Sequence, residues 1–84
     1  MLLNIAAYRF IAIGDPRALA DHIRSSATLH DLRGTAIVAP EGINLFLAGA
    51  EVQVRAFIDA LQRDPRFAGL PVKESWSEAQ PFAR

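Results

Sequence analysis

The sequence has 84 residues, of which nine are basic and nine acidic, and its formal net charge is zero at pH 7. This length predicts a single domain, and the balanced charge lacks the basic excess typical of an autonomous nucleic-acid-binding protein. The chain has no cysteine, which excludes disulfides, thiolate catalysis and cysteine-ligated zinc, and with only two histidines, eight residues apart, we expect no metal site and no bound cofactor.

Residues 2–13, LLNIAAYRFIAI, are apolar on both alternating sets of side chains, which is typical of a central strand. The stretch carries Arg9 and lacks a basic start, so we interpret it as a buried strand and not as a signal peptide. The chain has no run of about 18 apolar residues, so we expect no membrane-spanning segment. A cytoplasmic location is the default expectation.

A helix is predicted after this strand. Asp15 suits the N-cap position, and Pro16 suits the first helical position, where its missing N–H costs nothing. The helix is expected to end near His30. Its apolar face is formed by residues at helical spacing, namely Leu19, Ala20, Ile23 and Ala27.

The stretch GTAIVAPEGINLFLAG, residues 34–49, predicts a strand over 34–39, a tight turn, and a strand over 43–48. Gly42 supplies the positive φ that a short hairpin commonly requires. Glu41 and Asn44 are the polar side chains of this turn. They either contact a ligand or partner, or serve the hairpin itself, Glu41 as a solvated turn residue and Asn44 as a hydrogen-bonding one.

A second helix is predicted from about residue 50, and Asp64-Pro65 ends it. Its buried face repeats at helical spacing and consists of Val54, Phe57, Ile58 and Leu61. Residues 70–76 predict a last strand at a sheet edge. Residues 77–84 are polar, contain a proline, and are interpreted as the start of a linker.

The order strand, helix, strand, strand, helix, strand predicts an α+β fold, a ferredoxin-like βαββαβ sandwich over residues 1–76. Right-handed crossovers place both helices on one face of a four-stranded antiparallel sheet. If the helices cover one alternating set of strand residues, the other set is open to solvent. This open set includes three aromatic residues, Tyr8, Phe10 and Phe46, which predicts a docking surface. The plainer alternative is that the C-terminal tail covers them.

Two site types common on this fold are poorly matched. Acylphosphatase chemistry needs an arginine in a glycine-rich loop after the first strand. Here that loop contains one glycine and Asp15, which would repel a phosphate, and the first arginine after it, Arg17, is predicted to be helical. An RNA-recognition motif needs a specific run of aromatic residues on its central strands, but the third strand offers only Phe46. A looser arrangement, in which Tyr8, Phe10 and Phe46 stack bases, is left as a weakly supported alternative.

Four stretches resemble a known family. They are YRFIAIGDPRAL (8–19), RGTAIVAPEGIN with LAG (33–44 and 47–49), DPRFAGLPVKES (64–75) and PFAR (81–84). In this order they resemble the N-terminal, acylphosphatase-like domain of the bacterial rhodanese-like tRNA uridine 5-hydroxylases, a family earlier grouped with sulfurtransferases. The sequence departs from the family at Leu45-Phe46, where relatives often carry small or polar residues.

The resemblance implies that the whole protein takes part in oxygen-dependent 5-hydroxylation of the wobble uridine of tRNA. In the family, a rhodanese domain with a reactive cysteine follows this one. The chain without cysteine therefore resembles an excised domain or a truncated member, which should not turn over substrate alone. Four residues match the family's turn motif, and a role beyond turn formation is expected for them: Pro40, Glu41, Gly42 and Asn44.

The leading interpretation is a non-catalytic domain that helps to position tRNA or the rhodanese domain. Phosphate contacts would come from Arg9, Arg33 or Lys73, provided that these share a surface. A second interpretation is a structural docking module whose open face packs on its own C-terminal domain or on a second copy, as a weak, concentration-dependent homodimer. A third is a stand-alone enzyme of the acylphosphatase type.

Overall fold

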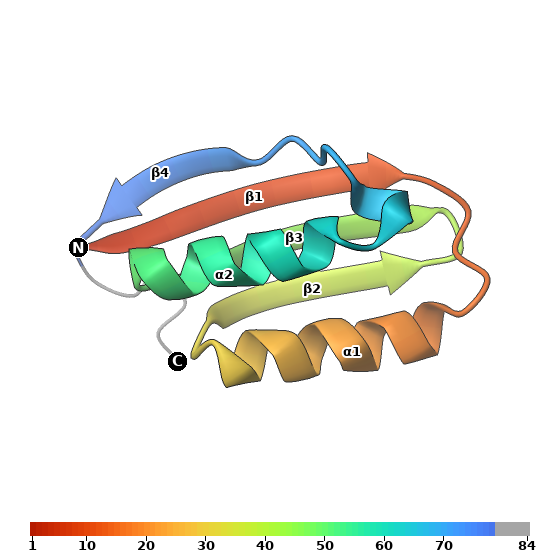
Figure 1. Ribbon diagram of the computed structural model, residues 1–84, viewed down its shortest axis with the longest axis horizontal. Coiled ribbons are helices and arrows are strands. Elements are labelled where there is room, and N and C mark those ends of the chain that lie inside the picture. Colours follow the sequence, from red (N-terminus) through yellow and green to blue (C-terminus); the bar gives the residue numbers. More distant parts are fainter. Residues whose placement is uncertain (79–84) are drawn as a thin grey trace.

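Four strands and two helices account for most of residues 1–78, the part of the chain that the computed structural model describes. The elements are β1 (Leu2–Phe10), α1 (Pro16–Leu29), β2 (Arg33–Ala39), β3 (Gly42–Gly49), α2 (Glu51–Gln62), the 3-10 turn η1 (Pro65–Phe67) and β4 (Lys73–Ser77). The strands form one antiparallel sheet in the order β2-β3-β1-β4, and both helices lie on the same face of it (Figure 1). The predicted ferredoxin-like α+β fold is confirmed.

β1 lies between β3 and β4, as its two-sided apolarity predicted. The strand ends at Phe10 rather than at residue 13, because β3 begins at Gly42, the register partner of Phe10. Beyond that pair, the backbone groups next to β1 are those of the β2–β3 turn. The amide of Ile11 accordingly donates to the carbonyl oxygen of Glu41, and the amide of Ile13 donates to that of Pro40, both at 2.9 Å.

Both helices begin where the sequence predicted, and each buries one side. Pro16 is the first residue of α1, which ends at Leu29 with His30 as its C-cap. Asp15 occupies the N-cap position, but its side chain makes no capping hydrogen bond, so the local capping prediction is only half correct. The buried residues of the two helices are Leu19 and Ile23 of α1, and Val54, Phe57 and Leu61 of α2.

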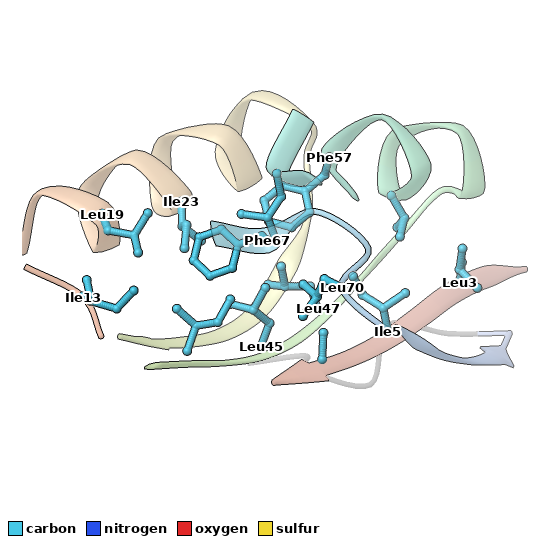
Figure 2. Close-up of a cluster of buried hydrophobic side chains, with 14 residues drawn as sticks. Leu3, Ile5, Ile13, Leu19, Ile23, Leu45, Leu47, Phe57, Phe67 and Leu70 are labelled. Atoms are coloured by element: carbon cyan, nitrogen blue, oxygen red, sulfur yellow. The ribbon is translucent and has the colours of Figure 1, made fainter. Parts of the chain in front are cut away.

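The hydrophobic core fills the space between the helices and the sheet (Figure 2). Its largest fully buried side chains are Phe57 and Phe67, of which the second belongs to η1 and not to a helix or strand. Burying a phenylalanine or leucine side chain contributes about 1.5–3 kcal/mol. The sheet contributes the odd-numbered residues of β1 and β3, namely Leu3, Ile5, Ala7, Ile43, Leu45 and Leu47.

The C-terminal strand is shorter at its start than predicted. Leu70 is buried, but it belongs to the loop after η1, where its amide donates to the carbonyl oxygen of Phe67 at 3.1 Å. β4 then runs through Ser77, so the boundary predicted after residue 76 falls one residue inside the strand. Residues 79–84 of the predicted linker, and the PFAR motif with them, lie outside the described residues.

Neither helix of the described residues has the length and apolar character that crossing a bilayer requires.

Candidate functional site

Three aromatic side chains stand on the sheet face that the helices leave uncovered. Register alignment places Tyr8 beside Asn44, and Ala6 beside Phe46, so the even-numbered residues of β1 and β3 share this face. Phe10 is 86% exposed, Tyr8 62% and Phe46 44%. The predicted exposure of the three rings is confirmed, and a docking role for them stays a prediction. We call the face that carries them the open face.

The rings of Tyr8 and Phe10 lie close together but are not parallel. Their centroids are 5.8 Å apart, and the ring planes are inclined by 56°. A hollow of about 600 Å³ adjoins them, and its lining includes Tyr8, Phe10, Asn44, Phe46, Pro71 and Lys73. This volume is in the range typical of small-molecule sites.

Two smaller hollows, each of about 370 Å³, continue the first one across the sheet. One shares Phe10 and Asn44 with it and extends to Glu41 on the β2–β3 turn. The other shares Phe46 and Lys73 and extends towards β4. The open face is therefore hollowed along a path from the turn to the β4 edge.

In the turn motif, the backbone and the polar side chains have different roles, and the backbone role is structural. Gly42 has a φ of +153°, and a Cβ there would collide with the backbone carbonyl of Arg9. The carbonyl oxygens of Pro40 and Glu41 accept hydrogen bonds from the amides of Ile13 and Ile11, which follow β1. The backbone of the motif thus holds β1 against the hairpin.

The side chains of Glu41 and Asn44 are exposed, and neither has a hydrogen-bond or ion-pair partner within residues 1–78. The structural alternative required that Asn44 hydrogen-bond the hairpin, and its side chain makes no such bond within residues 1–78. An amide offers both a donor and an acceptor. A carboxylate and an amide that serve no contact inside the described fold are available to another molecule.

Two of the three cations predicted to contact RNA line the same hollow, and the third lies apart from them. Lys73 is in register with Ala6 and lines the central hollow of the open face. Arg33 begins the edge strand β2, in the register row of Ala48, and also lines a separate groove of about 710 Å³ between α1 and β2. Arg9 lines the same hollow as Lys73, and its Nη1 donates to the carbonyl oxygens of Arg66 and Ala68 at 3.1 Å each.

An ion-pair cluster at the end of the sheet escaped sequence reasoning. Arg66 pairs with Asp64 at 2.8 Å and with Asp15 at 3.1 Å, and its guanidinium lies 5.5 Å from the ring centroid of Phe67. The cluster joins the loop before α1 to η1, and Arg9 binds η1 from the sheet. The sequence signal was the DPRF stretch, but the distance of 51 residues between Asp15 and Arg66 hid their contact.

This cluster also bears on phosphate chemistry. The loop between β1 and α1 presents Asp15, whose carboxylate is already paired with Arg66. Arg17, the first arginine after the loop, lies within α1. A carboxylate at this position opposes a bound phosphate, so the loop lacks the chemistry of an acylphosphatase site.

The variant Asp64→Asn is expected to be less acid-sensitive than the unchanged chain. Hydrogen bonds from the Arg66 guanidinium hold the pKa of the Asp64 carboxyl below its usual range. Because the pKa is lower in the folded state, this stabilisation is complete above the unfolded-state pKa of about 3.9 and is lost as the pH falls through the folded-state value. The pair is partly exposed, so the expected difference is at most about 1 kcal/mol.

Urea unfolding of both proteins between about pH 7 and pH 2 measures this effect. The free energy of unfolding should fall more steeply in the unchanged chain below about pH 4. Parallel pH profiles would contradict the assignment.

Among residues 1–78, no three histidine, aspartate or glutamate side chains are gathered as a metal-binding group would require.

The sequence matches the UPF0176 acylphosphatase-like domain over residues 2–84. It is 55% identical over 84 residues to a protein named tRNA uridine(34) hydroxylase from Xanthomonas euvesicatoria pv. vesicatoria (strain 85-10), covering 100% of this chain and 34% of that protein. A protein of the same name from Variovorax paradoxus (strain S110) is 55% identical over 83 residues, which is 99% of this chain and 32% of the relative.

A third protein of that name, from Xylella fastidiosa (strain M23), is 49% identical over 84 residues, which is 100% of this chain and 33% of the relative. The chain therefore spans about a third of the length of these relatives.

Proposed function

Since the chain belongs to the UPF0176 acylphosphatase-like domain family, as its motifs predicted, we propose that it is a non-catalytic domain of a tRNA-modifying protein. The whole protein would hydroxylate uridine in tRNA, and this domain would position the tRNA or the catalytic domain. The observation that carries the proposal is the 55% identity, over the whole chain, to a protein named tRNA uridine(34) hydroxylase.

The surface of the domain supports a positioning role. The aromatic rings of the open face are exposed and lie outside the hydrophobic core, and the side chains of Glu41 and Asn44 have no hydrogen-bond or ion-pair partner within residues 1–78. Such groups are typical of a surface that meets another molecule. The partners that we propose are tRNA and a rhodanese-like catalytic domain of the same protein, in the cytoplasm.

A second proposal is that the domain only packs against other protein. The exposed apolar rings favour it, since a large apolar patch also suits a protein interface. The open face would then be covered by the catalytic domain or by a second copy in a weak homodimer. Sedimentation of the 84-residue chain over a range of concentrations separates these cases, because self-association shifts with concentration.

Replacement of the matching segment in the Xanthomonas euvesicatoria relative tests the leading proposal. In one variant of the relative the matching segment is deleted, and in a second variant, the chimera, this chain replaces that segment. The proposal predicts that the first loses hydroxylation of uridine 34 and that the second retains it, as measured by mass spectrometry of digested tRNA. Undiminished hydroxylation without the segment would overturn it.

The turn motif is tested in the same chimera. Glu41→Ala and Asn44→Ala are each expected to lower kcat/KM for tRNA hydroxylation by about tenfold, since losing one hydrogen bond to a partner costs about 1–1.5 kcal/mol. Both side chains are exposed, so the folded domain should keep its stability.

Asp59→Ala is the matched control for Glu41→Ala, because Asp59 is an exposed carboxylate on α2, on the helix-covered side. It should leave activity unchanged. Unchanged activity in both turn variants would contradict a role for this turn beyond its own fold.

A further inference from the structure

We propose that the open face binds unpaired nucleotides of RNA, with bases stacked on Tyr8, Phe10 and Phe46 and a phosphate held by Lys73. This inference rests on the proposed role with tRNA and adds which part of the RNA is bound and by which surface. Four observations support it: ring exposure, charge distribution, the position of Asn44, and the shape of the hollow.

The exposed rings of the open face do not pack in the hydrophobic core, so they are available to stack on another molecule. Phe10 is 86% exposed, although the neighbouring face of the same strand is buried. Water is a poor environment for an aromatic face, and every nucleobase offers a flat face that stacks on it. Since Tyr8 and Phe10 are inclined by 56°, a base that lies flat on one ring does not lie flat on the other. Successive bases splayed apart, as in single-stranded RNA, suit that arrangement, whereas a continuous paired stack does not.

Charge is unevenly distributed between the two faces. The whole chain is neutral, yet Arg9 and Lys73 both line the central hollow of the open face, and no carboxylate of residues 1–78 lines it. The acidic residue of β4, Glu74, belongs to the other set and pairs with Arg55 of α2 at 3.1 Å. Glu41 and Glu74 line only the two smaller hollows, at the ends of the path. A central hollow with two cations in a neutral domain complements a phosphate backbone.

Asn44 lies where it can read the edge of a stacked base. It is in register with Tyr8, lines the same hollow, and its side chain makes no hydrogen bond within the described chain. Its amide can donate to and accept from the Watson–Crick edge of a base that is stacked on Tyr8. The same side chain gives no advantage to a purely apolar partner.

The shape of the open face also favours nucleotides over a protein segment. The hollows run from the turn to the β4 edge, with aromatic rings, an amide and a lysine along them. Polar side chains interrupt the apolar surface, since Asn44 lies in register between Tyr8 and the exposed Ile37, and Thr35 lies beside Phe46. A protein interface normally has a contiguous apolar core, whereas single-stranded RNA needs separate stacking platforms beside a cation.

The test uses the 84-residue chain and fluorescently labelled oligouridine of six nucleotides, with binding followed by anisotropy at several salt concentrations. Phe10→Ala is expected to weaken binding by about tenfold, through one lost stacking contact. Lys73→Ala should weaken binding and also reduce the slope of log Kd against log salt by about 0.7, as the loss of one phosphate contact requires. A blunt RNA duplex should bind more weakly than oligouridine.

Two exposed residues on α1 provide matched controls. Leu29 is 80% exposed, so Leu29→Ala removes a comparable apolar group from the other side of the domain. Arg24 pairs with Asp21 at 3.6 Å on the exposed side of α1, so Arg24→Ala removes a positive charge of the same size. Both variants should bind oligouridine like the unchanged chain, with the same salt slope.

Absence of oligouridine binding would overturn the inference, and so would equal losses in the control variants or self-association of the chain through Phe10. Each of these results leaves the proposed positioning role open to its own test in the chimera. If oligouridine binds as expected but the chimera keeps full hydroxylation without the segment, the proposed function fails while the nucleotide site stands.

Discussion

Replacing Gly42 with alanine is expected to destabilise the domain by about 3 kcal/mol. Two effects add at this position. The φ of +153° is one that residues with a Cβ rarely adopt, and the new Cβ would collide with the backbone carbonyl of Arg9 on the neighbouring strand. Because that obstacle is backbone, it can move aside only if the β1–β3 pairing shifts. Urea unfolding followed by circular dichroism measures the loss.

Gly14→Ala is the matched control. Gly14 lies in the loop after β1, and no heavy atom outside its chain neighbours lies within 4 Å of a Cβ added there. The free energy of unfolding of the Gly14→Ala variant should differ from that of the unchanged chain by less than about 0.5 kcal/mol. Equal unfolding midpoints for the Gly42 and Gly14 variants would contradict the close approach of β1 to the turn.

The second large effect is expected at Phe67. Its side chain is completely buried although it lies in the three-residue turn η1. Phe67→Ala should cost about 3–5 kcal/mol, from lost transfer free energy and the cavity left behind. The loss is a large fraction of the 5–15 kcal/mol that typically stabilises a domain. Thermal unfolding should show a correspondingly lower Tm.

Phe10→Ala makes the same chemical change on the open face. Because Phe10 is 86% exposed, its removal should change the free energy of unfolding by less than about 0.5 kcal/mol. The two phenylalanines therefore separate stability from binding: Phe67→Ala should destabilise the domain, and Phe10→Ala should weaken RNA binding without destabilising it. Similar stability losses in both variants would refute the assignment of the two faces.

Much of the fold could be predicted because its signals are local and periodic. The two-sided apolarity of residues 2–13 placed β1 at the centre of the sheet, and alternation in β1 and β3 separated Leu45 and Leu47 from Phe46. The turn chemistry at Gly42 was equally readable, since positive φ strongly favours glycine.

The rest depended on contacts between distant segments. Capping preference predicted a local role for Asp15, but its carboxylate pairs with Arg66, which only the folded η1 brings near. A phosphate contact by Arg9 stays a prediction, but no local sequence signal indicated that its guanidinium donates to the carbonyl oxygens of Arg66 and Ala68. Gly34 gave no signal, although its φ of +138° and the nearby Phe46 carbonyl exclude a Cβ there.

The turn motif therefore has a backbone role and a side-chain role, which its sequence pattern alone does not distinguish. The backbone of Pro40, Glu41 and Gly42 fixes the end of β1 against the hairpin. The side chains of Glu41 and Asn44 contribute nothing to that contact and face solvent beside the open face. Stability assays should respond to Gly42, and tRNA assays to Glu41 and Asn44.

The most direct test of the account is an amide- and aromatic-resolved NMR titration of the 84-residue chain with a tRNA anticodon stem-loop, at low and at higher salt. We predict that shifts concentrate on Tyr8, Phe10, Asn44, Phe46 and Lys73, and that they weaken as salt rises. Shifts confined to the helices, or no shifts at all at low salt, would contradict the claim that the open face meets the unpaired nucleotides of tRNA.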